Sequence, residues 1–370
     1  MKLFCHRPTF TAAMQLVSAV VPTRTPKDIL KNVKLVAGDG KVTLIATDQE
    51  IGIRYEVPGV EADTGGEILL STNRIISILR ELQDDGVTIE ATSDKIRVSA
   101  GQSEFNLAAE DPAEFPPVTS FEGDQWFTVP GKSLKEMIRR TAFATDVEST
   151  RYALGGVLVE IDDSKITLAA TDSRRLAVVE TSISAHGGVK PPETSPVVPT
   201  KAMTLIERTI SDDDTDVDIS VRSNEVLVRS GRATIYSRLV EGRFPRYVDV
   251  IPKEAKEKVD LVIAPFHNAI RQAQIVTNEE SRGVDFNFAN GTLTLTSKAA
   301  EIGQSKVELP IGFDGDEITI TFDPRYVAEF LRVLEPENQV TLNLIDGENA
   351  AVFKTEDNYT YVIMPLSRDR

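Results

Sequence analysis

Residues 171–175, with the sequence Thr-Asp-Ser-Arg-Arg, carry the side chains that could most readily do chemistry. Asp172 stands between the hydroxyl groups of Thr171 and Ser173, and a carboxylate beside a hydroxyl is a pairing used in acid–base and nucleophilic catalysis. The alternative is a turn that ends a strand, because aspartate side chains accept hydrogen bonds from nearby backbone amides. The turn is favoured, since the same Thr-Asp pair occurs at a matching place earlier in the chain.

Two further segments resemble catalytic or phosphate-binding motifs, and each lacks an essential part. Residues 63–65 form the Asp-Thr-Gly triplet of aspartic proteases, but that chemistry needs two carboxylates that share a proton, and no second such triplet occurs. Residues 130–133, Pro-Gly-Lys-Ser, end like a phosphate-binding loop, yet Trp126 stands where the loop needs its first glycine. We therefore predict a glycine-rich hairpin turn at 62–67 and the start of a helix at 130–133.

The sequence also contains no pattern typical of a metal site. The acidic run at 211–218 lacks the glycine and the distal glutamate of a helix-loop-helix calcium site, which favours a solvated loop. His6, His186 and His267 lie far apart, without metal-ligand spacing. We expect no catalytic residue, no metal and no cofactor, although assembly of a catalytic site from distant segments stays open.

Composition indicates a cytoplasmic protein of two or three domains. The 370 residues are 41% hydrophobic, and the single cysteine, Cys5, excludes an internal disulfide framework and fits a reducing compartment. No apolar run is long enough for a membrane helix, and the N-terminus does not resemble a signal peptide. The net charge of -16 argues against a nucleic-acid partner unless the basic residues are confined to one surface.

The Thr-Asp segment belongs to a long internal repeat. The segment "VTLIATDQEIGI" at 42–53 matches "ITLAATDSRRLA" at 166–177, and "LTLTSKAAEIGQSKVEL" at 293–309 takes the comparable place without the aspartate. Blocks that predict a strand, a polar break and an amphipathic helix follow at 68–82, 196–210 and 318–334.

Each third of the chain opens with another predicted helix, at 10–21, 132–145 and 265–277, as the spacing of Leu134, Met137 and Ile138 indicates. Most of the remainder consists of short alternating runs separated by turn residues. A period of about 120 residues is far longer than that of a solenoid. We predict three α+β domains, at 1–123, 124–252 and 253–370, each with two helices packed on antiparallel sheets.

The repeat is accompanied by "ATDSRRLAVVE" at 170–180, "LVEGRFPRY" at 239–247 and "YVIMPL" at 361–366. In their order and spacing these segments resemble the bacterial DNA polymerase III β subunit family, the sliding clamps, over essentially the whole chain. The resemblance implies a crescent of three clamp domains that pairs head-to-tail into a ring-shaped homodimer around duplex DNA. It also implies a non-catalytic processivity factor that slides without sequence specificity and is opened by a separate loader.

The resemblance explains how a protein with a net charge of -16 could still bind DNA. An acidic exterior with basic inner helices would repel DNA outside the ring and accept it inside, through backbone contacts that carry no sequence information. The candidate helices carry suitable residues, although a solvated helix face remains the alternative for each: Arg74, Arg80, Lys132, Lys135, Arg139, Arg140, Lys201 and Arg208. The DNA-binding positions that the resemblance implies are Arg24, Arg74, Arg151, Tyr152, Lys201 and Arg282.

The resemblance also implies a hydrophobic cleft that binds short linear motifs of partner proteins. The implied partners are the polymerase α subunit, the clamp loader, other polymerases and repair proteins, and no membrane is involved. Burial in an ordinary core is the alternative for these residues. The matching lining is Leu154, Thr171, Ser173, Arg174, Arg175, Leu176, Pro245, Val250, Val362, Ile363, Met364, Pro365 and Leu366.

Two features depart from the family pattern. The chain continues past Leu366 with Ser-Arg-Asp-Arg, and the first-domain edge at 99–107 carries Gln102 and Glu104 where the family is commonly basic. One possibility is that the two sides of the dimer junction have exchanged charges, since the third-domain segment at 298–301 includes a lysine. The other is that the junction depends mainly on apolar contacts. We expect a stable dimer joined by edge strands, with an interface that includes Phe105, Leu107, Ile275 and Val276. The alternative function is that of a protein-interaction scaffold, which would keep the cleft but would not form a ring.

Overall fold

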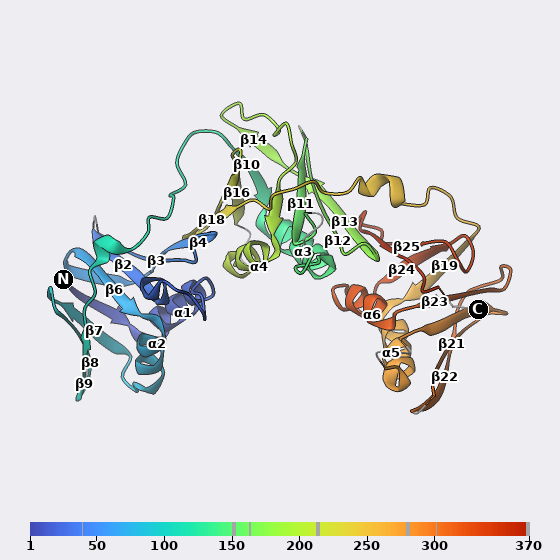
Figure 1. Ribbon diagram of the computed structural model, residues 1–370, viewed down its shortest axis with the longest axis horizontal. Helices are drawn as coiled ribbons and strands as arrows, with labels where there is room; N and C mark the ends of the chain where they lie inside the picture. The colour runs from blue at the N-terminus through green and yellow to red at the C-terminus, as the bar shows by residue number, and fades with distance from the viewer. Residues whose placement is uncertain are drawn as a thin grey trace. The chain divides into compact units, whose positions relative to one another are not determined.

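The computed structural model describes residues 1–38, 40–149, 153–162, 164–211, 215–278, 282–300 and 302–367. The chain forms two compact units. Figure 1 labels their helices and strands. The first contains Met1–Lys135 and Ser182–Leu239, and the second contains Glu136–Thr181 and Val240–Arg370. The two units do not test the domain boundaries at 123 and 252, which stay predictions.

The first unit contains two antiparallel sheets. One has the strand order β5-β1-β7-β8-β9 and the other has the order β14-β10-β16-β17-β18-β4-β3-β2-β6. The strands of this unit are β1 Lys2–His6, β2 Asn32–Gly38, β3 Lys41–Thr47, β4 Ile51–Glu56, β5 Val60–Thr64, β6 Gly66–Ser71, β7 Gly86–Ala91, β8 Lys95–Ala100, β9 Ser103–Ala108, β10 Trp126–Pro130, β14 Ser184–His186, β15 Val197–Pro199, β16 Asp216–Val221, β17 Glu225–Ser230 and β18 Ala233–Arg238. Of these, β15 belongs to neither of the two sheets.

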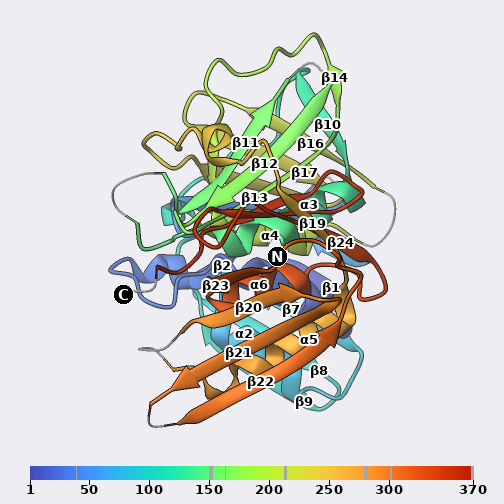
Figure 2. The same cartoon turned by 90° about the vertical axis from the view of Figure 1, so that its right-hand side faces the viewer.

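The second unit also contains two antiparallel sheets. Its strands follow the orders β11-β12-β13-β26-β25-β24-β19 and β22-β21-β20-β23, and Figure 2 shows the second of these sheets beside helix α5. The strands are β11 Gly156–Ile161, β12 Lys165–Thr171, β13 Arg175–Ser182, β19 Glu257–Val262, β20 Val284–Ala289, β21 Thr292–Ala299, β22 Gly303–Pro310, β23 Ile318–Phe322, β24 Gln339–Leu344, β25 Ala351–Lys354 and β26 Thr360–Ile363.

Six α-helices occur among the described residues: α1 Arg7–Ser18, α2 Thr72–Glu81, α3 Gly131–Thr141, α4 Thr200–Thr209, α5 Ile263–Ala273 and α6 Pro324–Arg332. Short 3₁₀ turns lie at η1 Asp28–Lys31, η2 Pro112–Glu114, η3 Ala142–Ala144, η4 Tyr247–Val250 and η5 Gln274–Val276. The helices predicted at 10–21, 132–145 and 265–277 are thus confirmed, as is the helix start at Gly131. The three predicted strand-break-helix blocks are also confirmed.

The helices pack through one apolar face, as their residue spacing predicts. In α2, Ile75, Ile78 and Leu79 are buried, whereas Arg74 and Arg80 on the same helix are exposed. In the second unit, the ring of Phe330 on α6 stacks on the ring of Tyr361 on β26, and the two ring centroids lie 4.6 Å apart. Buried aromatic packing of this kind ties the C-terminal strand to the helix.

The prediction of a hairpin turn at 62–67 is wrong. β5 pairs with β1 in the five-stranded sheet, whereas β6 pairs with β2 in the nine-stranded sheet, so the segment crosses from one sheet to the other. The crossing needs glycine, because Gly66 has a φ of 148° and a Cβ at Gly65 would lie 2.8 Å from the carbonyl oxygen of Ala37. Among the helices of the described residues, none has the length and hydropathy needed to span a bilayer.

Candidate functional site

The two Thr-Asp segments form the same turn, and the turn prediction is confirmed. The Thr171 hydroxyl donates to the carbonyl oxygen of Arg175 (2.6 Å) and accepts from the N–H of Ser173 (3.1 Å). Asp172 Oδ1 accepts from the backbone N–H groups of Arg174 (2.9 Å) and Arg175 (3.0 Å). These bonds occupy the carboxylate and the hydroxyl that could otherwise have served as a catalytic pair.

The first-domain copy repeats this geometry with other side chains. The Thr47 hydroxyl donates to the carbonyl oxygen of Ile51 (2.8 Å), and Asp48 accepts from the N–H groups of Glu50 (3.0 Å) and Ile51 (2.8 Å). The residue after each aspartate has a left-handed backbone, with a φ of 80° at Gln49 and 72° at Ser173. The turn therefore depends on the Thr-Asp pair, while the residues after it are free to differ in charge.

In the second copy, Arg175 is the residue that fastens the turn to its surroundings. Its side chain is only 8% exposed. Its Nε donates to Asp172 Oδ2 (3.0 Å), one terminal nitrogen donates to Glu329 of α6, and the other donates to the carbonyl oxygen of Phe143 (2.7 Å). The guanidinium also lies over the Tyr326 ring, 4.5 Å from its centroid. One buried cation thus joins segments that are far apart in sequence.

The environment of Arg175 keeps it charged. Burial works against the charged form, but the neighbouring oxygens of Tyr361, Glu329 and Asp172 outweigh this effect and raise the pKa of Arg175 above its usual value. The ion pairs of this residue therefore persist throughout the physiological pH range.

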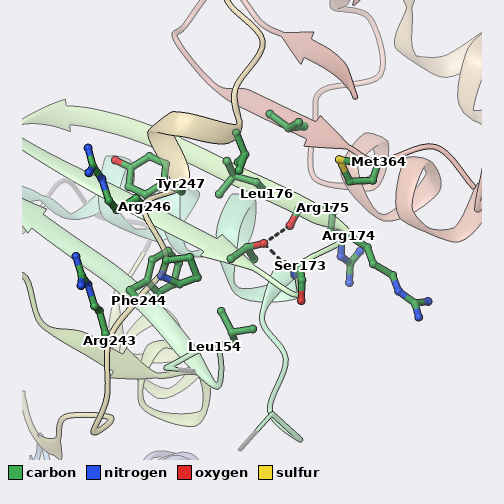
Figure 3. A pocket seen from close by; sticks show the side chains of 14 residues that line it. Leu154, Ser173, Arg174, Arg175, Leu176, Arg243, Phe244, Arg246, Tyr247 and Met364 are labelled. Atoms are coloured by element: carbon green, nitrogen blue, oxygen red, sulfur yellow. Dashed lines mark hydrogen bonds between the residues drawn. The ribbon is translucent and has the colours of Figure 1, made fainter. Parts of the chain in front are cut away.

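An apolar cleft of about 670 Å³ opens beside this turn, within the second unit (Figure 3). The turn between β12 and β13 forms one part of its wall, the segment around Pro245 forms another, and the C-terminal strand β26 with Met364 forms a third. The lining comprises Leu154, Thr171, Ser173, Arg174, Arg175, Leu176, Arg243, Phe244, Pro245, Arg246, Tyr247, Val250, Val362 and Met364.

The structure brings together ten of the thirteen residues predicted for the cleft. The three that do not line it are Ile363, Pro365 and Leu366. Successive side chains of a strand point to opposite faces, so Val362 and Met364 face the cleft while Ile363 is fully buried. Leu366 donates its N–H to the carbonyl oxygen of Thr321 (2.9 Å), which leads the chain away from the cleft.

Four lining residues were missing from the prediction: Arg243, Phe244, Arg246 and Tyr247. All four belong to the segment at 239–247 on which the resemblance partly rests, so that segment was the available signal. The Tyr247 hydroxyl donates to Glu160 of β11, and burial together with this bond raises the pKa of Tyr247 well above its usual value. The Tyr247 side chain therefore stays protonated and stabilises the cleft wall by donating its hydrogen bond to Glu160.

Of the residues predicted to contact DNA, Arg24, Arg74 and Lys201 are exposed and Arg282 is half-buried. The Lys201 ammonium pairs with Asp48 of the first turn at 2.5 Å. Exposed pairs of this kind contribute less than about 1 kcal/mol, so the lysine can exchange partners. Arg151 and Tyr152 lie outside the described residues.

The expectation that Arg140 belongs to a DNA-facing set is wrong. Its side chain is 8% exposed and pairs with Asp357 (2.6 Å) and Glu136, while the guanidinium lies 5.1 Å from the centroid of the Tyr359 ring. The positive charge of Arg140 is therefore neutralised by carboxylates within the second unit. Lys132 and Arg139 of the same helix are exposed.

The residues predicted for the dimer junction lie at sheet edges or beside them. β9, with half-buried Phe105 and Leu107, is the last strand of the five-stranded sheet. β22 is the last strand of the four-stranded sheet, and η5 beside it carries Ile275, which is 74% exposed, and half-buried Val276. Glu104 pairs with Arg97 of its own sheet at 2.7 Å, so its charge is already partly compensated.

Comparison with known families covers the chain from end to end. Models of the DNA polymerase III beta subunit match three successive segments: the N-terminal domain at residues 1–119, the central domain at 128–246 and the C-terminal domain at 248–367. Beta sliding clamps from Chlamydia muridarum and Escherichia coli K12 are each 28% identical, over 367 and 369 residues, and the alignments cover 99% of this chain with 99% and 100% of the relatives.

Solved structures agree. A sliding clamp from Pseudomonas aeruginosa bound to griselimycin has a TM-score of 0.91 at 28% identity, with both chains covered completely. The sliding clamp from Bacillus subtilis has a TM-score of 0.91 at 26% identity and covers 100% of this chain and 99% of that one.

The fold therefore consists of three clamp domains, each with two α-helices and antiparallel sheets. The chain belongs to the DNA polymerase III beta subunit family, the beta sliding clamps of DNA replication. This is a non-catalytic family of processivity factors, so the Thr171-Asp172-Ser173 corner serves architecture.

Proposed function

We propose that this chain forms a ring-shaped homodimer that encircles duplex DNA, slides without sequence specificity and tethers partner proteins through the apolar cleft. The partners would be the replicative polymerase, the clamp loader, other polymerases and repair proteins. The domains of the ring would be residues 1–123, 124–252 and 253–370.

The distribution of charge carries the DNA-binding part of the proposal. Apart from buried Arg140, the six α-helices contain eleven lysines and arginines against four carboxylates, although the whole chain has 41 basic and 57 acidic residues. A surface built from these helices would attract phosphates while the rest of the protein repels them. Because such contacts fall on the DNA backbone, they would allow sliding.

The cleft supports the tethering part. Its lining is largely apolar, yet Val250 is 56% exposed and Met364 is 47% exposed. Exposed apolar residues beside a cavity are typical of binding sites for other proteins. Methionine adapts its shape to different apolar partners, which suits a cleft that several proteins share.

Retention on circular DNA tests the ring directly. The protein is loaded on a nicked circle with a matching clamp loader, and the circle is then linearised. A ring should stay on the closed circle and run off the linear form. A scaffold without a ring would never be retained, and an ordinary DNA-binding protein would remain after linearisation.

Reversing exposed charges on the DNA-binding surface should weaken loading. The double variant Arg24→Glu and Arg74→Glu is expected to reduce retained clamp severalfold and to flatten its salt dependence by about one to two units of log–log slope. Lys95→Glu on β8 is the control, because it makes the same kind of charge change on an exposed strand residue. Peptide binding should be unchanged in both the double variant and the control. If the double variant loads as well as the control, the proposed DNA contacts would be contradicted.

Unpaired strand edges support the dimer. β9 and β22 each end a sheet, and an edge strand leaves backbone N–H and C=O groups open to pairing with another chain. Edge pairing between β9 of one protomer and β22 of its partner would satisfy these groups and bring Phe105 and Leu107 towards Ile275 of the partner subunit.

An aspartate at the exposed apolar position of this junction should separate the protomers. Ile275→Asp is expected to raise the dimer dissociation constant at least about 100-fold, because a buried junction cannot solvate the new carboxylate. Equilibrium sedimentation should then find a 40.6 kDa species instead of one of twice that mass. Val147→Asp, at a residue 69% exposed, is the control and should remain dimeric. A wild-type chain that is monomeric at micromolar concentration would contradict the dimer.

A further inference from the structure

The rim of the cleft has an unexpected charge. The fourteen lining residues include four arginines and no aspartate or glutamate, in a chain where carboxylates outnumber basic residues. We propose that the cleft selects partner segments in which acidic residues flank the apolar anchors. This inference rests on the proposed role of the cleft as a peptide-binding site and names the chemistry of its ligands.

Two of these arginines have no carboxylate partner among the residues that the structure describes. Arg175 is neutralised by Asp172 and Glu329, and Arg246 pairs with Asp249 at 3.2 Å. Arg174 and Arg243 are exposed, and neither forms an ion pair with a carboxylate in the described part of the chain.

Some exposed arginines elsewhere on the protein pair with carboxylates of the same chain. Arg97 pairs with Glu104 (2.7 Å), Arg222 with Glu225 (2.9 Å) and Arg232 with Glu56 (3.5 Å). Pairing inside the chain is thus available to exposed arginines of this acidic protein. In the described part of the chain, Arg174 and Arg243 have no such partner, as is also true of exposed Arg271. What distinguishes the rim is that its arginines gather beside an apolar cleft whose lining contains no carboxylate.

The internal repeat shows that the fold does not require the charge of Arg174. In the first-domain copy of the turn, Glu50 stands where the second copy has Arg174. Both residues donate a backbone N–H to the preceding aspartate, at 3.0 Å and 2.9 Å respectively. Since the same turn forms with either charge, the arginine at position 174 is available for a role in binding.

The arrangement of the arginines indicates what the ligand would look like. Figure 3 shows Arg174 on one side of the cleft and Arg243 and Arg246 on the other, with Leu154 and Leu176 between them. A peptide with leucine or phenylalanine in the apolar floor would therefore place its neighbouring residues against guanidinium groups. Carboxylates at those flanking positions would form charge-assisted pairs, which arginine geometry favours.

The expected size of the effect follows from the exposure of the rim. An exposed ion pair changes affinity by about two- to fivefold, and rim charges act mainly on the association rate. Two or three such pairs would give about tenfold selectivity at low salt, and screening should reduce it as the ionic strength rises.

A pair of labelled peptides tests the inference by fluorescence anisotropy on the full chain. The first is a ten-residue peptide with one leucine, one phenylalanine and three flanking aspartates, and the second has asparagine in place of each aspartate. The acidic peptide should bind about tenfold more tightly at about 50 mM NaCl, and the difference should shrink to about twofold at about 500 mM.

Neutralising the rim should remove this selectivity while keeping the apolar binding. In the triple variant Arg174→Gln, Arg243→Gln, Arg246→Gln, the two peptides should bind with equal affinity, and replacing their leucine and phenylalanine by alanine should still abolish binding. Arg271→Gln, an exposed position on α5 that does not line the cleft, is the control for the loss of an arginine elsewhere and should keep the selectivity.

The outcomes separate this inference from the proposed function. Equal affinity of the two peptides, or selectivity that survives in the triple variant, overturns the inference and leaves peptide binding intact. Failure of both peptides, together with insensitivity to replacing leucine and phenylalanine by alanine, would instead contradict the peptide-binding cleft. Displacement of the acidic peptide by a short DNA duplex, lost in the triple variant, would assign the arginines to phosphate and overturn the inference.

Discussion

Replacement of Arg175 by methionine is expected to lower the free energy of unfolding of the second unit by about 3 kcal/mol. The change leaves Asp172, whose side chain is 15% exposed, without its cation, and it removes the donor from the carbonyl oxygen of Phe143. The loss falls at the lower end of the range for broken buried pairs, because Glu329 is 37% exposed and keeps part of its hydration. Hydrogen exchange of the amides in β13 and β26 measures the loss locally.

The neighbouring residue provides the control for this prediction. Arg174→Met makes the same chemical change at an exposed side chain and should alter stability by less than about 0.5 kcal/mol. Arg175→Lys should recover only part of the loss, because one ammonium group cannot reach three separate acceptors in the fixed geometry of a guanidinium. Equal effects of Arg174→Met and Arg175→Met would show that the buried ion pairs do not hold the turn.

Deletion of residues 364–370 is expected to weaken peptide binding at least about 100-fold. It removes the exposed Met364 side chain from the cleft and the bond from the Met364 N–H to the carbonyl oxygen of Arg174 (2.8 Å), which joins two of the cleft walls. β26 ends at Ile363, so the strand itself is retained. Dimer mass and retention on circular DNA should be unchanged.

A shorter deletion distinguishes the cleft from the chain end. Removal of residues 368–370 keeps Met364 and should change peptide affinity by no more than about twofold, because the apolar lining of the cleft is retained. If both deletions weaken binding equally, the charged end of the chain would be the important contact and Met364 would not. Anisotropy with the peptides described above measures both variants.

Local patterns predicted much of the fold. The apolar spacing of Leu134, Met137 and Ile138 predicts α3, and the Thr-Asp pair predicts the turn that ends β12. Both features form through contacts between residues a few positions apart, so the sequence within a short window contains the information. The hairpin predicted at 62–67 failed because the choice between pairing with the next strand and crossing to another sheet is not made locally.

The cleft was predicted only in part, for a related physical reason. Its residues were recognised through the resemblance, but which of them face inward depends on the alternation of β26 and on the route of the segment around Pro245. Ile363 was therefore included and Phe244 was omitted, although the same short segments contain the residues that do line the cavity.

The threefold repeat, the helices, the Thr-Asp turns and the family can all be recognised from the order of the residues. The partners of the charged side chains cannot, because they depend on how the chain folds. Arg140 forms an ion pair with Asp357 and Arg175 forms one with Glu329, which lie 217 and 154 positions further along the chain. Arg174, by contrast, lies at the rim of the cleft. Charges of the same kind look alike in sequence, and their roles differ because folding brings distant carboxylates to some of them and not to others.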